Sequence, residues 1–520
     1  MAQRRALCHP APVSDRLPDL HDWMRHGLYD PEAGYYAAGR VRFGHNADFW
    51  TFPTRLSPGF GQLLAEHLAG LRARLLRGGD LGPDDPFDVV ELGAGTGALA
   101  RDIVDAAAAM VERPEPFAGL ARTLRYRIGE RAPALQRAQR ELLGDRPVVH
   151  LPQTAADLLP QAEPMVGVIL HNELLDVWPH ALLRPSQGQT LRLDGGFDQA
   201  EMVPAMRRAF ADPATPALRP TPHWQPTAEG AADAGYLAAI APLVAHREQA
   251  AAGPAELLHA AELGALTTWA AKTLRAGWML TIDYGADVSH GLDPTPALAQ
   301  LRLFPQPDAP PTGAAAAAAL CDLDWPGRQD VTVDIDFSHL AWVGERDGLR
   351  AVLHGPQGLL APGSSLAGAL GTVELDLLAP ANRRAAESTM RRDAARAGRP
   401  PPDVFEAAQL VFSAARGFVR GSAGFRMLLQ EREGTAGTLA PALAGAPDAF
   451  PVLPADVPLL RPDATPEAIA AALHGALGEA SAPLVATLTP SRSLVCAVDE
   501  AGLRVALPAI LRALEPLRLA

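Results

Sequence analysis

The segment that most constrains the fold of this chain is VVELGAGTGALA at residues 89–100. An apolar run ends at Glu91-Leu92, and Gly93, Gly95 and Gly97 follow before a helix-forming stretch. Glycine lacks a Cβ, so the backbone can turn tightly there and approach a ligand closely. Ligands bind at this edge of a doubly wound sheet. The segment therefore predicts a binding site built on Glu91, Gly93, Ala94, Gly95, Thr96 and Gly97.

The spacing of these glycines separates two classes of ligand. A dinucleotide turn follows the pattern G-x-G-x-x-G and places a diphosphate at the helix N-terminus. Here the pattern is G-x-G-x-G, and Glu91 lies two residues before the first glycine. A carboxylate repels a diphosphate but attracts an ammonium and a sulfonium. The motif therefore favours S-adenosylmethionine over NAD; a tight turn that binds no ligand is the remaining interpretation.

Strand-like and helix-like segments alternate on both sides of this turn. Apolar strand patterns recur in LRYRIGE at 124–130, MVGVILHNELLD at 165–176 and AGWMLTIDYG at 276–285. This alternation predicts an α/β fold with a mostly parallel, Rossmann-like sheet. Glu130 closes the second strand, where a carboxylate can accept hydrogen bonds from ribose hydroxyls. A solvated charge that caps the next helix is the alternative for Glu130.

The length of 520 residues exceeds one ordinary core, so we expect insertions and additions around the α/β domain. Residues 329–337 alternate like a strand, and 357–432 are predicted to be mostly helical. Composition and pattern divide the chain into a helical N-terminal region at 1–80, the α/β domain at 81–435 with an insertion at about 194–254 and a loop at about 286–326, and a C-terminal extension at 436–520.

Charge and composition exclude several classes of protein. The formal net charge of -13 argues against binding nucleic acid by phosphate neutralisation. The three cysteines form no CxxC pair, which fits a reducing compartment. No apolar run approaches the ~20 residues that span a bilayer, and the first residues lack the apolar core of a signal peptide. Lys272 is the only lysine, a bias typical of a GC-rich bacterial genome. We therefore expect a cytoplasmic bacterial protein.

Motifs in one consistent order give the chain a resemblance to the MidA-type methyltransferases, a family with a mitochondrial member that methylates an arginine of a complex I subunit. The matching pieces run discontinuously from about residue 17 to 432: M24-x-x-x-L28-Y29-x-P31-x-x-G34-Y35-Y36, D48-F49-x-T51, S57, F60-G61, ELGAGTG, Y126-x-I128-x-E130, L135, Q139, N172-E173-L174-L175-D176, D283-Y284-G285, QDVTVDIDF, Q357 and F425-R426. The resemblance implies a class I methyltransferase fold, S-adenosylmethionine as cofactor, and an arginine of a protein partner as methyl acceptor.

The resemblance also implies which residues face the acceptor. Asn172, Glu173 and Asp176 lie at the carboxyl end of the third predicted strand, facing the same crevice, and are the predicted catalytic residues. Methyl transfer to an activated carbon mainly requires positioning, and carboxylates can orient an arginine guanidinium and localise its charge. The alternative is that Asn172 and Asp176 only cap and turn the loop between a strand and a helix. The remaining residues predicted on the substrate side are Tyr35, Tyr36, Asp48, Asp283 and Tyr284. For the N-terminal three, packing against the main domain is the alternative.

The chain departs from the family pattern on the acceptor side. Ala47 stands where the family has glycine, and Asp334 where it usually has histidine. Leu301-Arg302-Leu303-Phe304 is the only remnant of a Gly-Thr-Leu-Arg stretch. Asp330, Asp334 and Asp336 share one face of the predicted strand, and we expect a solvated face there and no metal site. The turn at Glu91 to Gly97 is unaltered, so cofactor binding is the safer prediction.

Three functions remain open from the sequence. The first is a protein arginine methyltransferase, whose partner is a respiratory complex I subunit or assembly intermediate. The second is a cofactor-binding assembly or scaffold protein without catalysis. The third is a small-molecule N- or O-methyltransferase. Turnover with a protein acceptor separates the first from the others.

Overall fold

The structure is a computed structural model, and it describes residues 17–39, 41, 58–194, 196, 199–211, 221–251, 253–286, 288, 301–305, 329–357 and 425–436, with short pieces at 471–472, 474–475, 487–488 and 494–495. The bounds of the elements below refer to these residues.

A mostly parallel sheet of eight strands forms the centre of the molecule, in the order β13-β14-β9-β4-β1-β2-β3, with β12 pairing to β9. Only β14 runs antiparallel to its neighbours β9 and β13. After β3 the chain crosses back to place β4 on the other side of β1, which makes the carboxyl ends of β1 and β4 the topological switch point. The strands are β1 Phe87–Leu92, β2 Leu124–Gly129, β3 Val148–His150, β4 Met165–Asn172, β9 Leu274–Ala286, β12 Ile335–Asp336, β13 Leu349–Pro356 and β14 Phe425–Arg432.

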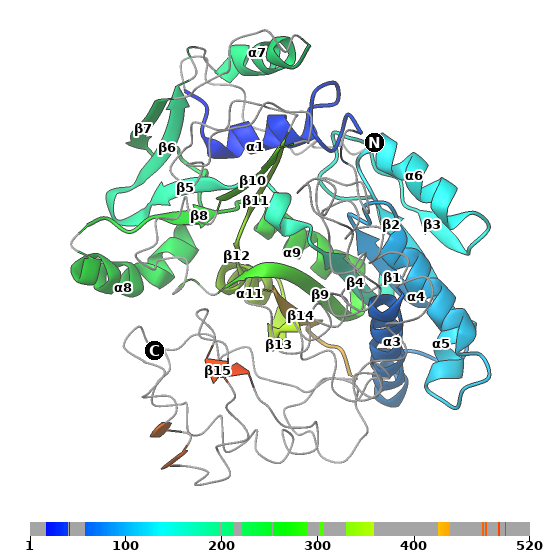
Figure 1. The fold of residues 1–520 in the computed structure, drawn as a ribbon. Helices are drawn as coiled ribbons and strands as arrows, with labels where there is room; N and C mark the ends of the chain where they lie inside the picture. Colours follow the sequence, from blue (N-terminus) through cyan, green and yellow to red (C-terminus); the bar gives the residue numbers. More distant parts are fainter. Residues whose placement is uncertain are drawn as a thin grey trace, which may run out of the picture.

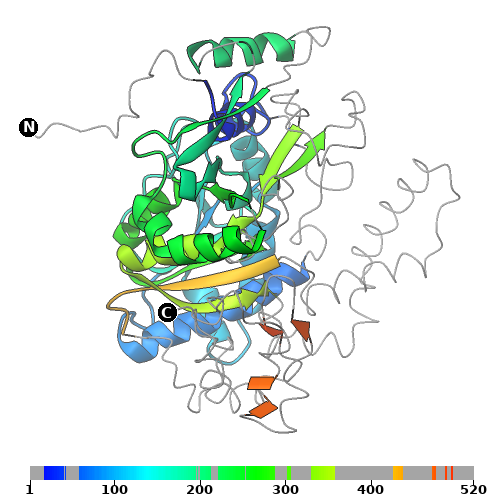
Figure 2. The same cartoon turned by 90° about the vertical axis from the view of Figure 1, so that its left-hand side faces the viewer.

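Helices cover both faces of this sheet because successive strand residues point to opposite sides. Val89 and Val168 pack with one helical layer, whereas Val90 and Ile169 pack with the other. Figure 2 shows β14 between the blue helix α3 and the green helices on the opposite face. The first layer is α3 Gly59–Gly78, α4 Ala98–Ala109 and α5 Phe117–Thr123, and the second is α9 Leu263–Thr273 and α11 Phe337–Arg346; α6 Pro133–Leu143 joins β2 to β3.

A second, antiparallel sheet of four strands has the order β7-β6-β5-β8. It lies beside α1 Leu20–Tyr29, away from β1 to β3 (Figure 1). The four strands of this sheet begin before residue 194 and end after residue 254, the predicted bounds of the insertion. We therefore propose that the insertion spans residues 181–259. The elements are β5 Ala181–Arg184, β6 Gln189–Asp194, α7 Gln199–Ala211, β7 Thr221–Pro226, α8 Ala234–Ala251 and β8 Leu257–His259, with the 3-10 turns η1 Leu175–Val177 and η2 Pro185–Gln187.

Two predicted segments are wrong in the parts that the structure describes. Residues 357–432 were expected to be mostly helical, yet their described end is the strand β14. Met427 to Leu429 are buried on both faces of the sheet, so their apolar run has no period that separates strand from helix. The predicted loop at 286–326 contains β10 Leu301–Pro305, which pairs with β11 Gln329–Val333. The structure also has short strands β15 Thr487–Leu488 and β16 Leu494–Val495.

Among the described residues, no helix has both the length and the apolar composition needed to cross a membrane.

Candidate functional site

The Gly-rich turn, residues 93–97, connects β1 to α4 at the switch point. Gly93, Gly95 and Gly97 all have positive φ, at 65°, 53° and 85°. A Cβ on Gly93 would lie 2.6 Å from Cδ1 of Leu174, in the loop after β4, and one on Gly97 would lie 3.3 Å from Cγ of Gln139. The turn is thus left-handed and closely packed, and its three glycines place no Cβ between the backbone and a ligand.

Glu91 lies at the end of β1 and is almost fully buried, with 3% of its surface exposed. The hydroxyl of Tyr126, on β2, donates a 2.8 Å hydrogen bond to Glu91 Oε2. Burial raises the pKa of Glu91 to about 7. A carboxylate in this state is poised to ionise when a positively charged ligand arrives.

Glu130 follows β2 and is also buried. Its Oε1 accepts the backbone N–H of Ala132 at 2.9 Å, and its Oε2 accepts the Nε2 of Gln139 at 3.2 Å. Burial raises the pKa of Glu130 to about 7. Glu91, the Gly-rich turn and Glu130 therefore meet at the carboxyl ends of two adjacent strands, as the sequence predicts.

The loop after β4 is organised by Asp283, at the end of β9. Asp283 is fully buried, and burial together with nearby carboxylates raises its pKa well above the usual range. Its oxygens accept backbone N–H groups rather than facing a cavity: Oδ2 from Leu174 at 3.2 Å, Leu175 at 2.9 Å and Asp176 at 3.3 Å, and Oδ1 from Tyr284 at 2.9 Å. Asp283 thus shapes the turn that presents the other predicted residues.

Asn172 and Asp176 present unused oxygens beside this turn. The Tyr284 hydroxyl donates to Asp176 Oδ2, and Asn172 Nδ2 donates to Glu173 Oε1 at 3.2 Å. Asn172 Oδ1 and Asp176 Oδ1 are buried, and neither has a hydrogen-bond partner among the residues that the structure describes. Burial raises the pKa of Asp176 to about 6. Two buried acceptors without donors fit a ligand that brings N–H groups.

Glu173 is the one non-glycine residue of the described chain with positive φ, at 49°. We expect Glu173→Gly to raise the free energy of unfolding by about 1 kcal/mol, because glycine adopts this conformation without strain. Chemical denaturation measures the change. Glu141→Gly on the exposed side of α6 is the control and should lower stability by about 1 kcal/mol. An equal fall in the free energy of unfolding of both variants would contradict backbone strain at Glu173.

The N-terminal tyrosines pack across the same edge of the sheet. Tyr29 donates to the backbone oxygen of Val177 at 3.0 Å and stacks on Tyr36 with ring centroids 6.0 Å apart. Tyr35 is fully buried and contacts Tyr36 edge to face at 5.0 Å. Burial, with Asp330 and Asp176 nearby, raises the pKa of Tyr36 well above the usual range. Tyr36 therefore lies near Asp176 and Asp330, whereas Asp48 lies outside the described residues.

The aspartates of the 329–337 segment have separate structural tasks. Asp330 is 1% exposed, so the expectation of a solvated face is wrong there; β11 packs against the N-terminal tyrosines and covers it. Asp334 pairs with Arg302 at 2.7 Å. Asp336 caps α11 by accepting the N–H of Ser338 at 2.9 Å.

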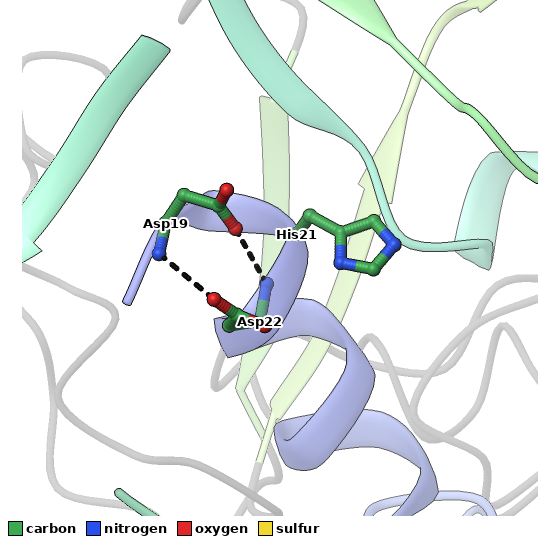
Figure 3. A group of neighbouring side chains, drawn as sticks. All are labelled: Asp19, His21 and Asp22. Atoms are coloured by element: carbon green, nitrogen blue, oxygen red, sulfur yellow. Dashed lines mark hydrogen bonds between the residues drawn. The ribbon is translucent and has the colours of Figure 1, made fainter. Parts of the chain in front are cut away.

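A second acidic group gathers Asp19, His21 and Asp22 at the start of α1 (Figure 3). Asp19 and Asp22 form a capping box, each accepting the other's backbone N–H. Asp19 also pairs with Arg192 at 2.8 Å, and His21 pairs with Glu262. Capping and ion pairs account for this group, so we assign it to the stability of α1.

Two residues with a role in this geometry were missed by sequence reasoning. Tyr126 and Gln139 matched the family pattern, but neither was assigned a function. Gln139 donates to Gly95 O at 2.8 Å as well as to Glu130. A glutamine that is fully buried on an otherwise amphipathic helix is the signal, and burial is visible only in the structure.

Comparisons with known proteins identify the family of this chain. A family model described as "Putative S-adenosyl-L-methionine-dependent methyltransferase" matches residues 79–355, more than half of the chain. A Drosophila melanogaster protein named "Protein arginine methyltransferase NDUFAF7 homolog, mitochondrial" is 38% identical over 95 residues. That alignment spans only 18% of this chain and 18% of the relative.

Two crystal structures of COG1565 superfamily proteins from Burkholderia thailandensis share the fold. One, bound to S-adenosyl-homocysteine, has a TM-score of 0.53 and 22% identity, and the comparison covers 84% of this chain and 90% of that chain. The other, a native structure, has a TM-score of 0.50 and 21% identity over the same shares of the two chains. The Rossmann-like class I fold predicted from the sequence is thereby confirmed. With the match of the family model and the MidA-type motifs, the chain belongs to this family of S-adenosylmethionine-dependent methyltransferases.

Proposed function

We propose that the protein transfers the methyl group of S-adenosylmethionine to an arginine side chain of a partner protein. The observation that carries this proposal is a pair of buried oxygens, Asn172 Oδ1 and Asp176 Oδ1, that have no hydrogen-bond partner within the described part of the chain and lie in the loop that packs against the Gly-rich turn. A guanidinium brings several N–H donors in a planar fork, which suits two such acceptors. The named Drosophila arginine methyltransferase homologue supports the same acceptor class.

The cofactor residues divide the work of binding. Residues 93–97 offer backbone groups to the amino-acid end, Glu91 offers a carboxylate near the positive charge, and Glu130 accepts the ribose hydroxyls. When bound, the cofactor supplies a methyl group on a sulfonium, a carbon already activated for displacement. No residue of the chain then needs to act as a nucleophile.

The acceptor residues orient the attacking nitrogen. Asp176 and Asn172 bind the guanidinium N–H groups, and the Tyr284 hydroxyl holds Asp176 in place. The negative field of Glu173 and Asp176 draws the positive charge away from the attacking nitrogen. As the N–C bond forms and the C–S bond breaks, the nitrogen loses a proton, and Asp176, with a pKa of about 6, accepts it on Oδ1.

The partner is proposed as a subunit or assembly intermediate of respiratory complex I, and the location as the bacterial cytoplasm. Both rest on the MidA-type resemblance and on the composition of the chain. A scaffold without catalysis and a small-molecule methyltransferase are the competing functions. A scaffold does not explain why two buried oxygens lack donors in the described part of the chain, because binding without catalysis does not need them. The chemistry of the labelled acceptor separates the small-molecule methyltransferase from the proposal.

The test is transfer of labelled methyl from S-adenosylmethionine to proteins of an extract made from cells that lack this chain. We expect one labelled protein band, with methylarginine found by mass spectrometry. Asp176→Asn is the catalytic control and should give no label. Label confined to metabolites, or to no acceptor while the cofactor binds, would contradict the proposal and favour one of the competing functions.

Cofactor affinity is expected to rise with pH and to level off above about 7. Burial raises the pKa of Glu91 and of Glu130 to about 7, and the ligand's donors and positive charge prefer the ionised carboxylates. Binding therefore releases protons below this pH. Without ligand, stability falls as pH rises from 4.5 towards about 7, because the folded state holds protons that the unfolded state gives up. Calorimetry in two buffers of different ionisation enthalpy measures the proton release on cofactor binding. A cofactor affinity that does not change with pH would contradict the prediction.

A further inference from the structure

Gln139 joins three parts of the cofactor site through one buried amide. It lies on α6 and has no exposed surface. Its Nε2 donates to the backbone oxygen of Gly95 at 2.8 Å and to Glu130 Oε2 at 3.2 Å. Its Oε1 lies 3.1 Å from Nε2 of His150, the last residue of β3. The Gly-rich turn, the carboxylate after β2 and the end of β3 therefore share one side chain.

The chemistry of these neighbours fixes the orientation of the amide. A backbone carbonyl and an ionised carboxylate only accept hydrogen bonds, so the NH₂ group must face Gly95 and Glu130. The amide oxygen then faces His150, whose Nε2 must carry a proton. Neutral His150 is thus held in the Nε2–H tautomer, and every polar atom of the Gln139 side chain is used.

The turn itself is shaped to admit this side chain. Gly97 has φ of 85°, and a Cβ there would lie 3.3 Å from Gln139 Cγ and 3.6 Å from its Cα. A residue other than glycine would push α6 away from the turn. Gly97, the N-cap of α4, therefore allows Gln139 to pack closely against the turn.

We propose that Gln139 is a positioning residue for the cofactor. It holds the Glu130 carboxylate in the rotamer that binds the ribose, and it keeps the Gly95 carbonyl turned away from the ligand. His150 completes the network through its hydrogen bond to the amide oxygen of Gln139. The proposal rests on the assignment of Glu130 to the ribose. A glutamine suits this task because it donates to both acceptors at once, which a glutamate cannot do when ionised.

Two substitutions at Gln139 test the network by calorimetric titration with S-adenosylhomocysteine. Gln139→Met keeps the length but removes the hydrogen bonds, and we expect about 10- to 100-fold weaker binding, the usual worth of a hydrogen bond to a charged group. Gln139→Glu places a second carboxylate beside Glu130. Its affinity should fall as pH rises, because two ionised carboxylates repel, whereas wild-type affinity rises with pH. A merely structural role for Gln139 would not reverse the sign of this pH profile.

Controls separate packing from positioning. Gln161→Glu makes the same chemical change on an exposed residue and should leave affinity and its pH profile unchanged. His150→Ala, at a partly exposed position, should weaken binding about threefold to tenfold even if the Gln139 variants fold poorly. Wild-type affinity in Gln139→Met or His150→Ala, or a wild-type pH profile in Gln139→Glu, would overturn the proposal.

Glu130→Gln distinguishes failure of the network from failure of the site. Weak binding by Glu130→Gln with normal binding by Gln139→Met means that only the Gln139 inference is wrong. Normal cofactor binding by Glu130→Gln would show that Glu130 does not bind the ribose hydroxyls. We expect both variants to bind weakly and the double variant to bind little worse than either, because the two residues act as one unit.

Discussion

Replacing Asp176 by alanine is expected to lower kcat for methyl transfer at least about 100-fold while changing the Kd for S-adenosylhomocysteine less than about threefold. Asp176 Oδ1 is buried and has no hydrogen-bond partner among the residues that the structure describes, and its Oδ2 accepts the Tyr284 hydroxyl. In the proposed function this carboxylate binds the acceptor and not the cofactor. The labelled-methyl assay measures kcat, and calorimetry measures Kd.

Asp145→Ala is the matched control, since Asp145 is exposed after α6 and loses the same group. It should leave both values unchanged. If Asp176→Ala keeps more than about a tenth of wild-type kcat, the acceptor is oriented elsewhere. If the same variant instead loses the cofactor, Asp176 belongs to the cofactor site and the division proposed above is wrong.

Gly93→Val is expected to weaken S-adenosylmethionine binding at least about 100-fold. Gly93 has φ of 65°, and a Cβ there would lie 2.6 Å from Leu174 Cδ1. A β-branched residue is strained in this conformation, and its side chain would also separate the Gly-rich turn from the loop after β4. Titration calorimetry gives the affinity, and circular dichroism checks the fold.

Gly188→Val controls for backbone strain alone. Gly188 has a similar φ of 59° in the hairpin between β5 and β6, and nothing lies within 4 Å of its added Cβ. We expect Gly188→Val to lose stability through backbone strain alone and Gly93→Val to lose more through its added clash with Leu174, and we expect normal cofactor affinity only in Gly188→Val. Near-normal binding by Gly93→Val would show that the turn does not form the cofactor site.

The cofactor half of the site was predictable because its signals are local. Strand, acid, glycine spacing and helix lie within 89–100, and the φ values of Gly93, Gly95 and Gly97 show the left-handed turn that such spacing requires. The alternating pattern likewise predicted the parallel strands β1, β2, β4 and β9. Glu130 could be placed because the carboxyl ends of adjacent parallel strands meet at one edge.

The remainder depends on contacts between residues far apart in sequence. Asp283 was predicted on the substrate side, but its carboxylate organises a loop more than a hundred residues earlier. Asp330 was expected in solvent because strand periodicity does not show that β11 is covered by the N-terminal tyrosines. The strand β14 was predicted as helix because a strand buried on both faces loses its alternation. Gln139 shows its role only when its three partners are seen together.

Calorimetric titration of S-adenosylmethionine into the wild-type chain, with NAD as the comparison ligand, tests the central claim most directly. We expect saturable binding of S-adenosylmethionine with one site per chain and no binding of NAD, since the Glu91 carboxylate repels a diphosphate. A well-folded protein that binds neither ligand, or that binds NAD instead, would contradict it.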